Sequence, residues 1–258
     1  MQITSNRNPV MQGIRRAAAT GRTTEDGCIV AEGPHLLEEA LQGAWRIERI
    51  IATSEACDRH SRLLQNTGAT VTEVSERAFA AAAATETTQG VIALLRPRQY
   101  EWRDLMCHPT LLLVLDGVQD PGNAGTIVRS AEAFGATGIV FLTGCVRVAN
   151  GKFLRATAGS ILRMPYIETA SVADLNRFVA SGRIPLYALT ARGDLRITSA
   201  DLKNACAIAV GSEGTGISNE LLRSAIPVSI PAPKVESLNA AVACSIALFE
   251  AARQRSHR

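Results

Sequence analysis

The chain of 258 residues is long enough for two domains or for one large domain. With 47% hydrophobic residues, 20% charged residues and a formal net charge of +3, it neither requires nor excludes a polyanionic partner, because the distribution of charge matters more than its sum. No apolar run could span a bilayer and the N-terminus lacks the apolar core of a signal peptide, so we expect a soluble cytoplasmic protein with no membrane partner.

The cysteines are scattered singly and form no Cys-x-x-Cys pair, and no paired histidines lie near them. The six positions are Cys28, Cys57, Cys107, Cys145, Cys206 and Cys244. This pattern argues against a zinc site or a disulfide framework. It predicts buried free thiols in a reducing compartment and no bound metal.

The first ninety-odd residues alternate between predicted helices and strands, which indicates a compact α/β unit. The expected elements are a basic helix at Pro9–Thr20, a strand at Cys28–Ala31, a helix at Pro34–Leu41, a strand at Arg46–Ala52, a helix after Ser54, a strand at Thr70–Val74, a helix at Phe79–Ala84 and a strand at Gly90–Leu95. Residues 96–109 hold two of the ten prolines, mixed charge and no clean period. We interpret them as a linker between domains at 1–95 and 110–258.

The second half begins with a continuous apolar run at Leu111–Gly117, which is typical of a buried parallel strand. Further strands are expected at Gly138–Leu142, Pro185–Thr190, Ala205–Val210 and Pro227–Ile230, with helical stretches between them. The predicted fold class is therefore α/β with a parallel sheet. The last helix candidate, Ser237–Arg253, is densely apolar, so we expect it to be deeply packed or to lie at a subunit interface.

Three phrases each combine an apolar strand, a turn rich in glycine or proline, and a helix. They are LDGVQDPGNAGTIVRSAEAFGA (Leu115–Ala136), IAVGSEGTGIS (Ile208–Ser218) and IPAPKVESLNAAVACSIALFE (Ile230–Glu250). Such turns can meet at one edge of a sheet, where α/β folds bind ligands. In the first phrase Asn123 could cap the following helix. Arg129 lies on an otherwise apolar helix. It could form a structural ion pair, lie at the solvent-exposed edge of the helix, or have a functional role.

The turns of the other two phrases also have structural explanations. Gly211–Gly216 makes a poor phosphate cradle, since no lysine follows it and Glu213 would repel a phosphate, so the loop better suits an uncharged or cationic ligand. Glu213 looks buried, and it could instead lie favourably near the start of a helix. Ser237 is a natural cap for the last helix. Asn239 has a less obvious structural use, because asparagine is a mediocre helix former.

Together the three phrases resemble the motifs of the SpoU (TrmH) family of RNA ribose 2′-O-methyltransferases in the SPOUT superfamily. A fourth agreeing stretch is RATAGSILRMP (Arg155–Pro165), and NPVMQGIRR and IVAEGPHLLEEAL are similar to the family's L30e-like domain. The resemblance implies an L30e-like RNA substrate-binding domain at 1–95, a linker at 96–109 and a SPOUT catalytic domain at 110–258. That domain would carry a deep trefoil knot, an exception to the rule that chains avoid threading.

The resemblance also implies a cofactor, an assembly and site residues. The cofactor would be S-adenosylmethionine held in a bent shape, and the protein would be a homodimer with its site near the interface. The implied catalytic residues are Asn123, Arg129, Glu213, Ser237 and Asn239. The implied cofactor contacts are Leu189, Thr190, Gly211, Ile230 and Leu238, largely through backbone atoms. The run Pro231–Lys234 departs from the family pattern, which usually has a glycine there, so the conformation of this cofactor loop stays open.

Methyl transfer from a sulfonium to a ribose hydroxyl needs no metal, and the difficulty lies in the weakly acidic hydroxyl. Family proposals make the equivalent of Arg129 the general base, but a guanidinium keeps its proton at physiological pH. We therefore expect Arg129 to bind the adjacent phosphate and to stabilise charge on the 2′-oxygen. Asn123, Ser237 and Asn239 would orient the ribose. Glu213 would hold Arg129 or the cofactor loop.

RNA contacts are expected from basic residues of the N-terminal part and the approach to the site: Arg7, Arg15, Arg16, Arg22, Lys152 and Arg155. Ribosomal RNA is the favoured substrate because of the L30e-like domain, with tRNA second. One alternative is a non-catalytic RNA-binding or ribosome-assembly protein, which would have no need of all five polar groups. A dinucleotide-dependent enzyme is a more distant alternative, because no Gly-x-Gly-x-x-Gly follows an early strand.

Overall fold

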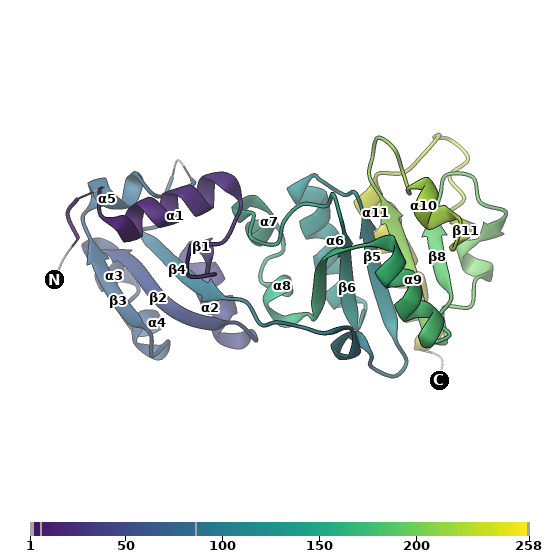
Figure 1. Cartoon of the computed structure of the whole chain (residues 1–258), viewed down its shortest axis with the longest axis horizontal. Coiled ribbons are helices and arrows are strands. Elements are labelled where there is room, and N and C mark those ends of the chain that lie inside the picture. Colours follow the sequence, from purple (N-terminus) through teal and green to yellow (C-terminus); the bar gives the residue numbers. More distant parts are fainter. Residues whose placement is uncertain (1–2, 6, 86, 257–258) are drawn as a thin grey trace. The chain divides into compact units, whose positions relative to one another are not determined.

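The computed structural model describes residues 3–5, 7–85 and 87–256, and it divides into two compact units (Figure 1). The first unit consists of Met1–Gln99 and Arg147–Arg163, and the second of Tyr100–Val146 and Met164–Arg258. Residues 147–163 therefore pack with the first unit although the chain on both sides of them belongs to the second. No helix in the described ranges is long and apolar enough to cross a membrane.

The first unit is built on a four-stranded mixed sheet in the order β1-β4-β2-β3. Strand β4 runs antiparallel to both β1 and β2, whereas β3 is parallel to β2. The strands are β1 (Ile29–Glu32), β2 (Arg46–Thr53), β3 (Thr70–Val74) and β4 (Val91–Arg96). The helices are α1 (Pro9–Thr20), α2 (Pro34–Gln42), α3 (Ser54–Arg59), α4 (Ser61–Asn66), α5 (Glu76–Ala80), α7 (Gly151–Ala156) and α8 (Ser160–Arg163).

Helix α1 covers one face of this sheet and leaves its basic side chains outside. Asn8 caps the helix by accepting the Val10 N–H at 2.9 Å, and the apolar side of the helix, with Met11 and Ile14, packs into the core. Alternate strand residues meet it there, because successive side chains of a strand point to opposite faces. Helix α2 contacts β1, β2 and β4.

The segment 147–163 packs against α2 and β1 of the first unit. The Ala44 N–H donates to the Leu162 carbonyl at 2.8 Å, and Arg163 forms an ion pair with Glu39. Gly159 has a positive φ of 86°, and a Cβ there would overlap the Glu39 side chain, so this close approach requires glycine. The predicted domain boundaries at residues 95 and 110 stay a prediction. They divide the chain into continuous segments, whereas the packing places residues 147–163, a part of 110–258, in the first unit.

The second unit is an α/β layer structure with a seven-stranded sheet in which every strand pair is parallel, so the predicted fold class is confirmed. The order is β7-β6-β5-β10-β8-β11-β9. The strands are β5 (Leu111–Asp116), β6 (Gly138–Leu142), β7 (Tyr166–Ala170), β8 (Leu186–Leu189), β9 (Leu195–Arg196), β10 (Cys206–Gly211) and β11 (Ile226–Ser229). The unit also contains two short 3-10 helices, η1 (Trp102–Leu105) and η2 (Ile197–Ser199).

Helices cover both faces of this sheet, which explains its continuous apolar strands. The helices are α6 (Pro121–Ala133), α9 (Val172–Ser181), α10 (Asn219–Leu222) and α11 (Ala240–Arg255). Figure 1 shows α9 in front of the strands and α6 and α11 behind them. Leu175 of α9 and Leu221 of α10 are fully buried in the core of their face, while α11 contacts both α6 and β10.

Several predicted boundaries are wrong, and helix caps account for two of them. The helix expected at Phe79–Ala84 begins earlier, because Ser75 caps α5 by accepting the Ala78 N–H at 3.3 Å. The last helix begins at Ala240 rather than at Ser237. Strands β7 and β9 were not predicted, since the first mixes polar and apolar residues and the second has only two residues.

All six cysteines are free, as predicted, but only three of them are buried. Cys28, Cys206 and Cys244 lie in the core, whereas Cys107 is exposed in the turn before β5, where the prediction of a buried thiol is wrong. Among the described residues, no group of three or more histidine, cysteine, aspartate or glutamate side chains could hold a metal ion.

Candidate active site

A pocket of about 460 Å³ lies at the carboxyl ends of β8, β10 and β11. These strands are neighbours and parallel, so the loops that follow them meet at one edge of the sheet. All five residues predicted as cofactor contacts line the pocket: Leu189, Thr190, Gly211, Ile230 and Leu238. Glu213 and Ser237, predicted as catalytic, line it as well.

The loop after β10 folds back tightly on its own starting point. A Cβ on Gly211 would overlap the backbone of Gly216 and Ile217, so only glycine fits at the end of this strand. The Gly216 N–H donates to the Ser212 carbonyl at 2.9 Å, and the hydroxyls of Ser212 and Thr215 lie 2.8 Å apart. The loop is therefore a closed turn whose backbone forms one wall of the pocket.

A chain of side-chain hydrogen bonds connects the three motifs. The Nδ2 of Asn239 donates to the Oδ1 of Asn123 at 3.3 Å, across 116 positions of sequence. The Nδ2 of Asn123 in turn donates to Glu213 Oε1, across 90 positions. Asn123 of the first motif is thus hydrogen-bonded to one residue from each of the other two motifs.

The helix caps differ from the sequence-based expectations. Asp120, not Asn123, caps α6 and accepts the Asn123 N–H at 2.7 Å, so the Asn123 side chain is free to reach the other motifs. Asn239, not Ser237, caps α11 and accepts the N–H groups of Ala241 and Val242 at 2.9 and 3.2 Å. Asp120 was not predicted, although its place directly before a proline at the first helical position is typical of a cap.

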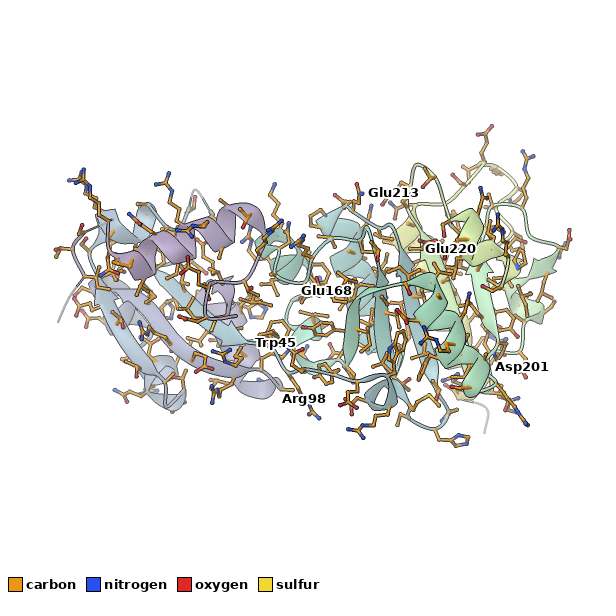
Figure 2. The ribbon with its side chains drawn as sticks, viewed as in Figure 1. Trp45, Arg98, Glu168, Asp201, Glu213 and Glu220 are labelled. Carbon is orange, nitrogen blue, oxygen red and sulfur yellow. The ribbon has the colours of Figure 1, made fainter. Side chains whose placement is uncertain are left out.

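Glu213 is exposed rather than buried, and it lies well before the helix that follows. Figure 2 shows it on a loop above the strands of the second unit, and α10 is capped by Ser218. The two structural expectations for Glu213 are therefore wrong. Its carboxylate accepts a hydrogen bond from Asn123. Of the two roles expected for Glu213, holding Arg129 or holding the cofactor loop, the first has no hydrogen bond to support it among the described residues.

Arg129 lies in the third turn of α6 and its side chain is exposed. Within the described part of the chain it forms no ion pair with a carboxylate and no hydrogen bond to the other four candidate residues, so it is not a structural ion pair. An uncommitted guanidinium keeps its planar set of donors free for a phosphate or a carboxylate of a partner.

Helices α6 and α11 hold these groups in register. Asn123 meets Asn239, the hydroxyls of Ser130 and Ser245 lie 2.7 Å apart, and the rings of Phe134 and Phe249 have centroids 5.8 Å apart. The contacts advance in the same direction along both helices, so the two helices run parallel. Their packing fixes the first and third motifs against each other.

The loop of the third motif, left open by the sequence, turns toward the pocket. The Val235 N–H donates to the Ala232 carbonyl at 3.3 Å, which closes a turn around Pro233 and Lys234. Ala232 and the residues from Val235 to Leu238 line the pocket. The loop without the usual glycine therefore still forms a wall of the candidate cofactor site.

The basic residues predicted to bind RNA all lie on the first unit. Arg7, Arg15, Arg16 and Arg22 are exposed on or beside α1, where Arg16 pairs with Glu25 at 2.8 Å. Lys152 and Arg155 belong to α7, which packs against β1 of the same unit. Arg147, at the start of the same segment, is also exposed and was not predicted.

Comparison with known proteins adds two family matches and close relatives in sequence and structure. Residues 110–249 match the SpoU rRNA Methylase family, and residues 14–93 match an MRM3-like substrate binding domain. An uncharacterized tRNA/rRNA methyltransferase of Synechocystis is 34% identical over 98% of this chain and 94% of its own length. The 23S rRNA (guanosine(2553)-2′-O)-methyltransferase of Bacillus subtilis is 29% identical over 96% of this chain and 98% of its own length.

Solved structures agree over nearly the whole chain. The AdoMet-bound rRNA methyltransferase from Sinorhizobium meliloti is 30% identical with a TM-score of 0.84, covering 98% of this chain and 97% of that one. The methyltransferase AviRb from Streptomyces viridochromogenes, in complex with AdoMet, has a TM-score of 0.86 at 24% identity, covering 97% of this chain and 99% of that one, which shows the shared fold.

Proposed function

The chain belongs to the SpoU rRNA methylase family, and on that premise we propose that it transfers a methyl group from S-adenosylmethionine to a ribose 2′-hydroxyl of ribosomal RNA. The observation that carries the proposal is the pocket at the strand ends with the chain Asn239–Asn123–Glu213 beside it. One polar residue from each of three distant motifs converges at the rim of a cavity of cofactor size.

The pocket fits S-adenosylmethionine in size and in charge. Its volume lies within the roughly 300–1,000 Å³ of small-molecule sites. Leu189, Ile230 and Leu238 offer apolar surface for a purine ring, and Glu213 and Glu236 are the only charged residues among those that line it. Two carboxylates and no basic side chain among the lining residues favour a cationic ligand. When bound, the cofactor supplies an electrophilic methyl group on a sulfonium.

The proposed division of labour follows from which groups are already engaged. Arg129, exposed and unpaired among the described residues, binds the phosphate next to the target ribose and stabilises negative charge on its 2′-oxygen. Ser237, whose hydroxyl makes no hydrogen bond among the described residues, orients the ribose. Asn123 assists it, because it keeps one Nδ2 hydrogen and one Oδ1 lone pair uncommitted. Asn239 has both lone pairs of its Oδ1 committed to the cap and an Nδ2 hydrogen to Asn123, so its role is to position Asn123. Glu213 holds the Asn123 amide from the other side.

We further propose a homodimer formed through α11. Val242, Ile246 and Phe249 are 48%, 38% and 54% exposed, although all three are large apolar side chains. Spaced by four and three residues, they lie on one side of the helix. A contiguous exposed apolar stripe of this kind marks an interaction surface, and α11 also carries Asn239, so the interface would adjoin the site.

The first unit is proposed to bind the RNA through its exposed basic residues on α1 and α7. Phosphate contacts of this kind make affinity fall steeply with added salt, and a flat salt response would contradict them. The cytoplasmic location and the trefoil knot belong to the same proposal. Family membership supports both.

The direct test supplies S-adenosylmethionine labelled on the methyl group to the purified protein with ribosomal RNA or with tRNA. A methylated 2′-oxygen cannot take part in alkaline cleavage of the backbone, so label on ribose survives alkali in dinucleotides. The proposal expects alkali-resistant label in ribosomal RNA. Label confined to tRNA would show that tRNA, not ribosomal RNA, is the substrate. Binding of the cofactor and of RNA without any methyl transfer would indicate a non-catalytic RNA-binding protein.

A further inference from the structure

Asp116 is a buried carboxylate at the edge of the sheet, next to the pocket but not among the residues that line it. It is the last residue of β5, only 7% exposed, and it is the register partner of Gly211 on the neighbouring strand β10. Its Oδ2 accepts the backbone N–H of Ser218 at 2.7 Å. Neither the motif reasoning nor the family match assigns it a role.

This hydrogen bond closes the loop that forms one wall of the pocket. The loop leaves the sheet after Gly211 and returns at Ser218, which then caps α10 by accepting the Leu221 N–H at 3.3 Å. Both ends of the loop are therefore held at the same level of the sheet. Gly211, where the loop leaves, is the register partner of Asp116, and Ser218, where it returns, donates to the Asp116 carboxylate.

The residues between these two anchors belong to the site. Ser212 to Ile217 all line the pocket. Glu213, near the middle of the loop, is the residue that holds Asn123. A shift of the loop's return would therefore disturb both the pocket wall and the hydrogen bonds between the motifs.

We propose that Asp116 is a positioning residue for the cofactor: by holding the Ser218 N–H, it keeps the loop 212–217 in the conformation that binds S-adenosylmethionine. The inference rests on the proposed function of the pocket. Burying a carboxylate is costly, and for stability alone an apolar side chain of similar size often serves as well. The Asp116 carboxylate is needed as an acceptor, because without it the backbone N–H of Ser218 would lose its hydrogen-bond partner.

The experiment measures the dissociation constant of S-adenosylmethionine by calorimetry for the full-length protein and four variants. Asp116→Ala removes the acceptor, and we expect roughly tenfold weaker binding or more. Asp116→Asn keeps a side-chain oxygen in place and should stay within about threefold of the wild type. Thermal unfolding without cofactor shows that each variant is folded at the temperature of the titration.

The donor is tested from the other side of the bond. Ser218 has φ −63°, which proline adopts readily, so Ser218→Pro removes the N–H at an allowed backbone angle and places its Cδ where the hydrogen bond to Asp116 lies. Ser218→Ala is its matched control, because it also loses the helix cap but keeps the N–H. We expect Ser218→Pro to bind the cofactor roughly tenfold more weakly than Ser218→Ala.

Two results would overturn the inference: Asp116→Ala binding as tightly as the wild type, or Asp116→Asn binding as weakly as Asp116→Ala. If Asp116→Ala does not fold, equal binding by Ser218→Pro and Ser218→Ala overturns it instead. A wild-type protein that binds no S-adenosylmethionine gives a different pattern, since it refutes the proposed function of the pocket and the inference with it.

Discussion

Arg129, which we propose stabilises charge on the 2′-oxygen, has the surroundings of a side chain that the fold itself does not need. It sits on a helix whose neighbours Ile127 and Val128 are fully buried, yet its own side chain is exposed and no carboxylate of the described residues pairs with it. Losing it should therefore cost little stability and a large part of the activity.

Arg129→Ala should lower kcat by about two to three orders of magnitude, because the variant loses a charge that stabilises the transition state. Arg129→Lys keeps the charge but not the bidentate fork, and we expect it to retain less than about a tenth of the wild-type rate. Single-turnover methylation of RNA measures both, and the melting temperatures of the two variants should equal that of the wild type. Near-full turnover by the lysine variant would show that guanidinium geometry is unimportant.

Asn239 caps α11 and also donates to Asn123, which we propose is its task in the site, and two substitutions separate these tasks. Asn239→Ser can still cap α11 but loses the Nδ2 donor to Asn123, so stability should hold while methyl transfer falls about tenfold. Asn239→Ala loses both and should also cost about 1 kcal/mol of unfolding free energy. Urea unfolding and transfer rates measure the two effects. Full activity in Asn239→Ser would remove Asn239 from the site.

Because Cys206 is buried, we expect the free energy of unfolding to fall at alkaline pH. Burial raises the pKa of Cys206 from the 9.0 of an ordinary thiol to about 11. The neutral thiol of the folded chain therefore contributes its full stability below about pH 9, and this contribution is lost as the pH rises to about 11, on the order of 2 kcal/mol in all. The free energy of urea unfolding should fall over this range, and less steeply in Cys206→Ala. Equal slopes would show that Cys206 does not titrate there.

At the residue scale the sequence identified the chemistry but not the local contacts. The five polar motif residues follow from the family resemblance. The caps do not, because serine, asparagine and aspartate all cap helices, and Asp120, Asn123, Ser237 and Asn239 offer several candidates within a few positions of each helix start. The residue that caps each helix is decided by tertiary hydrogen bonds, because these engage some of the other candidates, as Glu213 and Asn239 engage the side chain of Asn123.

At the scale of elements, the loop after β10 is the part of the site most sensitive to backbone geometry. It leaves the sheet at Gly211, folds back on Gly216 and returns to Asp116 through Ser218. Strands with continuous apolar runs, such as β5 and β10, were predictable from sequence, since both faces of the sheet are covered. The conformation of the loop was not, because it depends on hydrogen bonds between residues far apart in sequence.

Gly211→Ala should abolish cofactor binding, because the new Cβ would overlap the backbone of Gly216 and Ile217 and push the loop off the strand end. Gly214→Ala in the same loop is the matched control, since among the described residues only its two chain neighbours lie within 4 Å of the Cβ it would add. Calorimetry with S-adenosylmethionine compares the two variants. Equal binding by both would contradict the placement of the cofactor against this loop.

At the scale of the whole molecule, the segment 147–163 shows what local sequence patterns leave undetermined. Its motif, RATAGSILRMP, lies within the predicted catalytic domain at 110–258. Its buried residues, including Phe153 and Leu162, pack with the first unit, and its Arg163 pairs with Glu39. Nothing in the local pattern specifies the partner of an amphipathic segment, so tertiary packing alone assigns it.

The proposed dimer depends on the exposed apolar stripe of α11. Ile246→Glu places a charge in its middle and should convert the protein to monomers, with loss of methyl transfer if the interface adjoins the site. Ile226→Lys is the control, because Ile226 is similarly exposed, at 44% against 38%, but lies on β11. Light scattering after gel filtration measures the mass. A wild-type monomer, or a dimer that survives Ile246→Glu, would refute this interface.

The central claim is that the pocket and its convergent motifs methylate ribose 2′-hydroxyls of ribosomal RNA. Mapping alkali-resistant positions in total RNA from cells with the gene, without it, and with the gene restored as wild type or as Arg129→Ala tests it most directly. We expect at least one position in ribosomal RNA to lose protection without the gene and to regain it only with the wild type. An unchanged map in ribosomal RNA, or protection restored fully by Arg129→Ala, would contradict it.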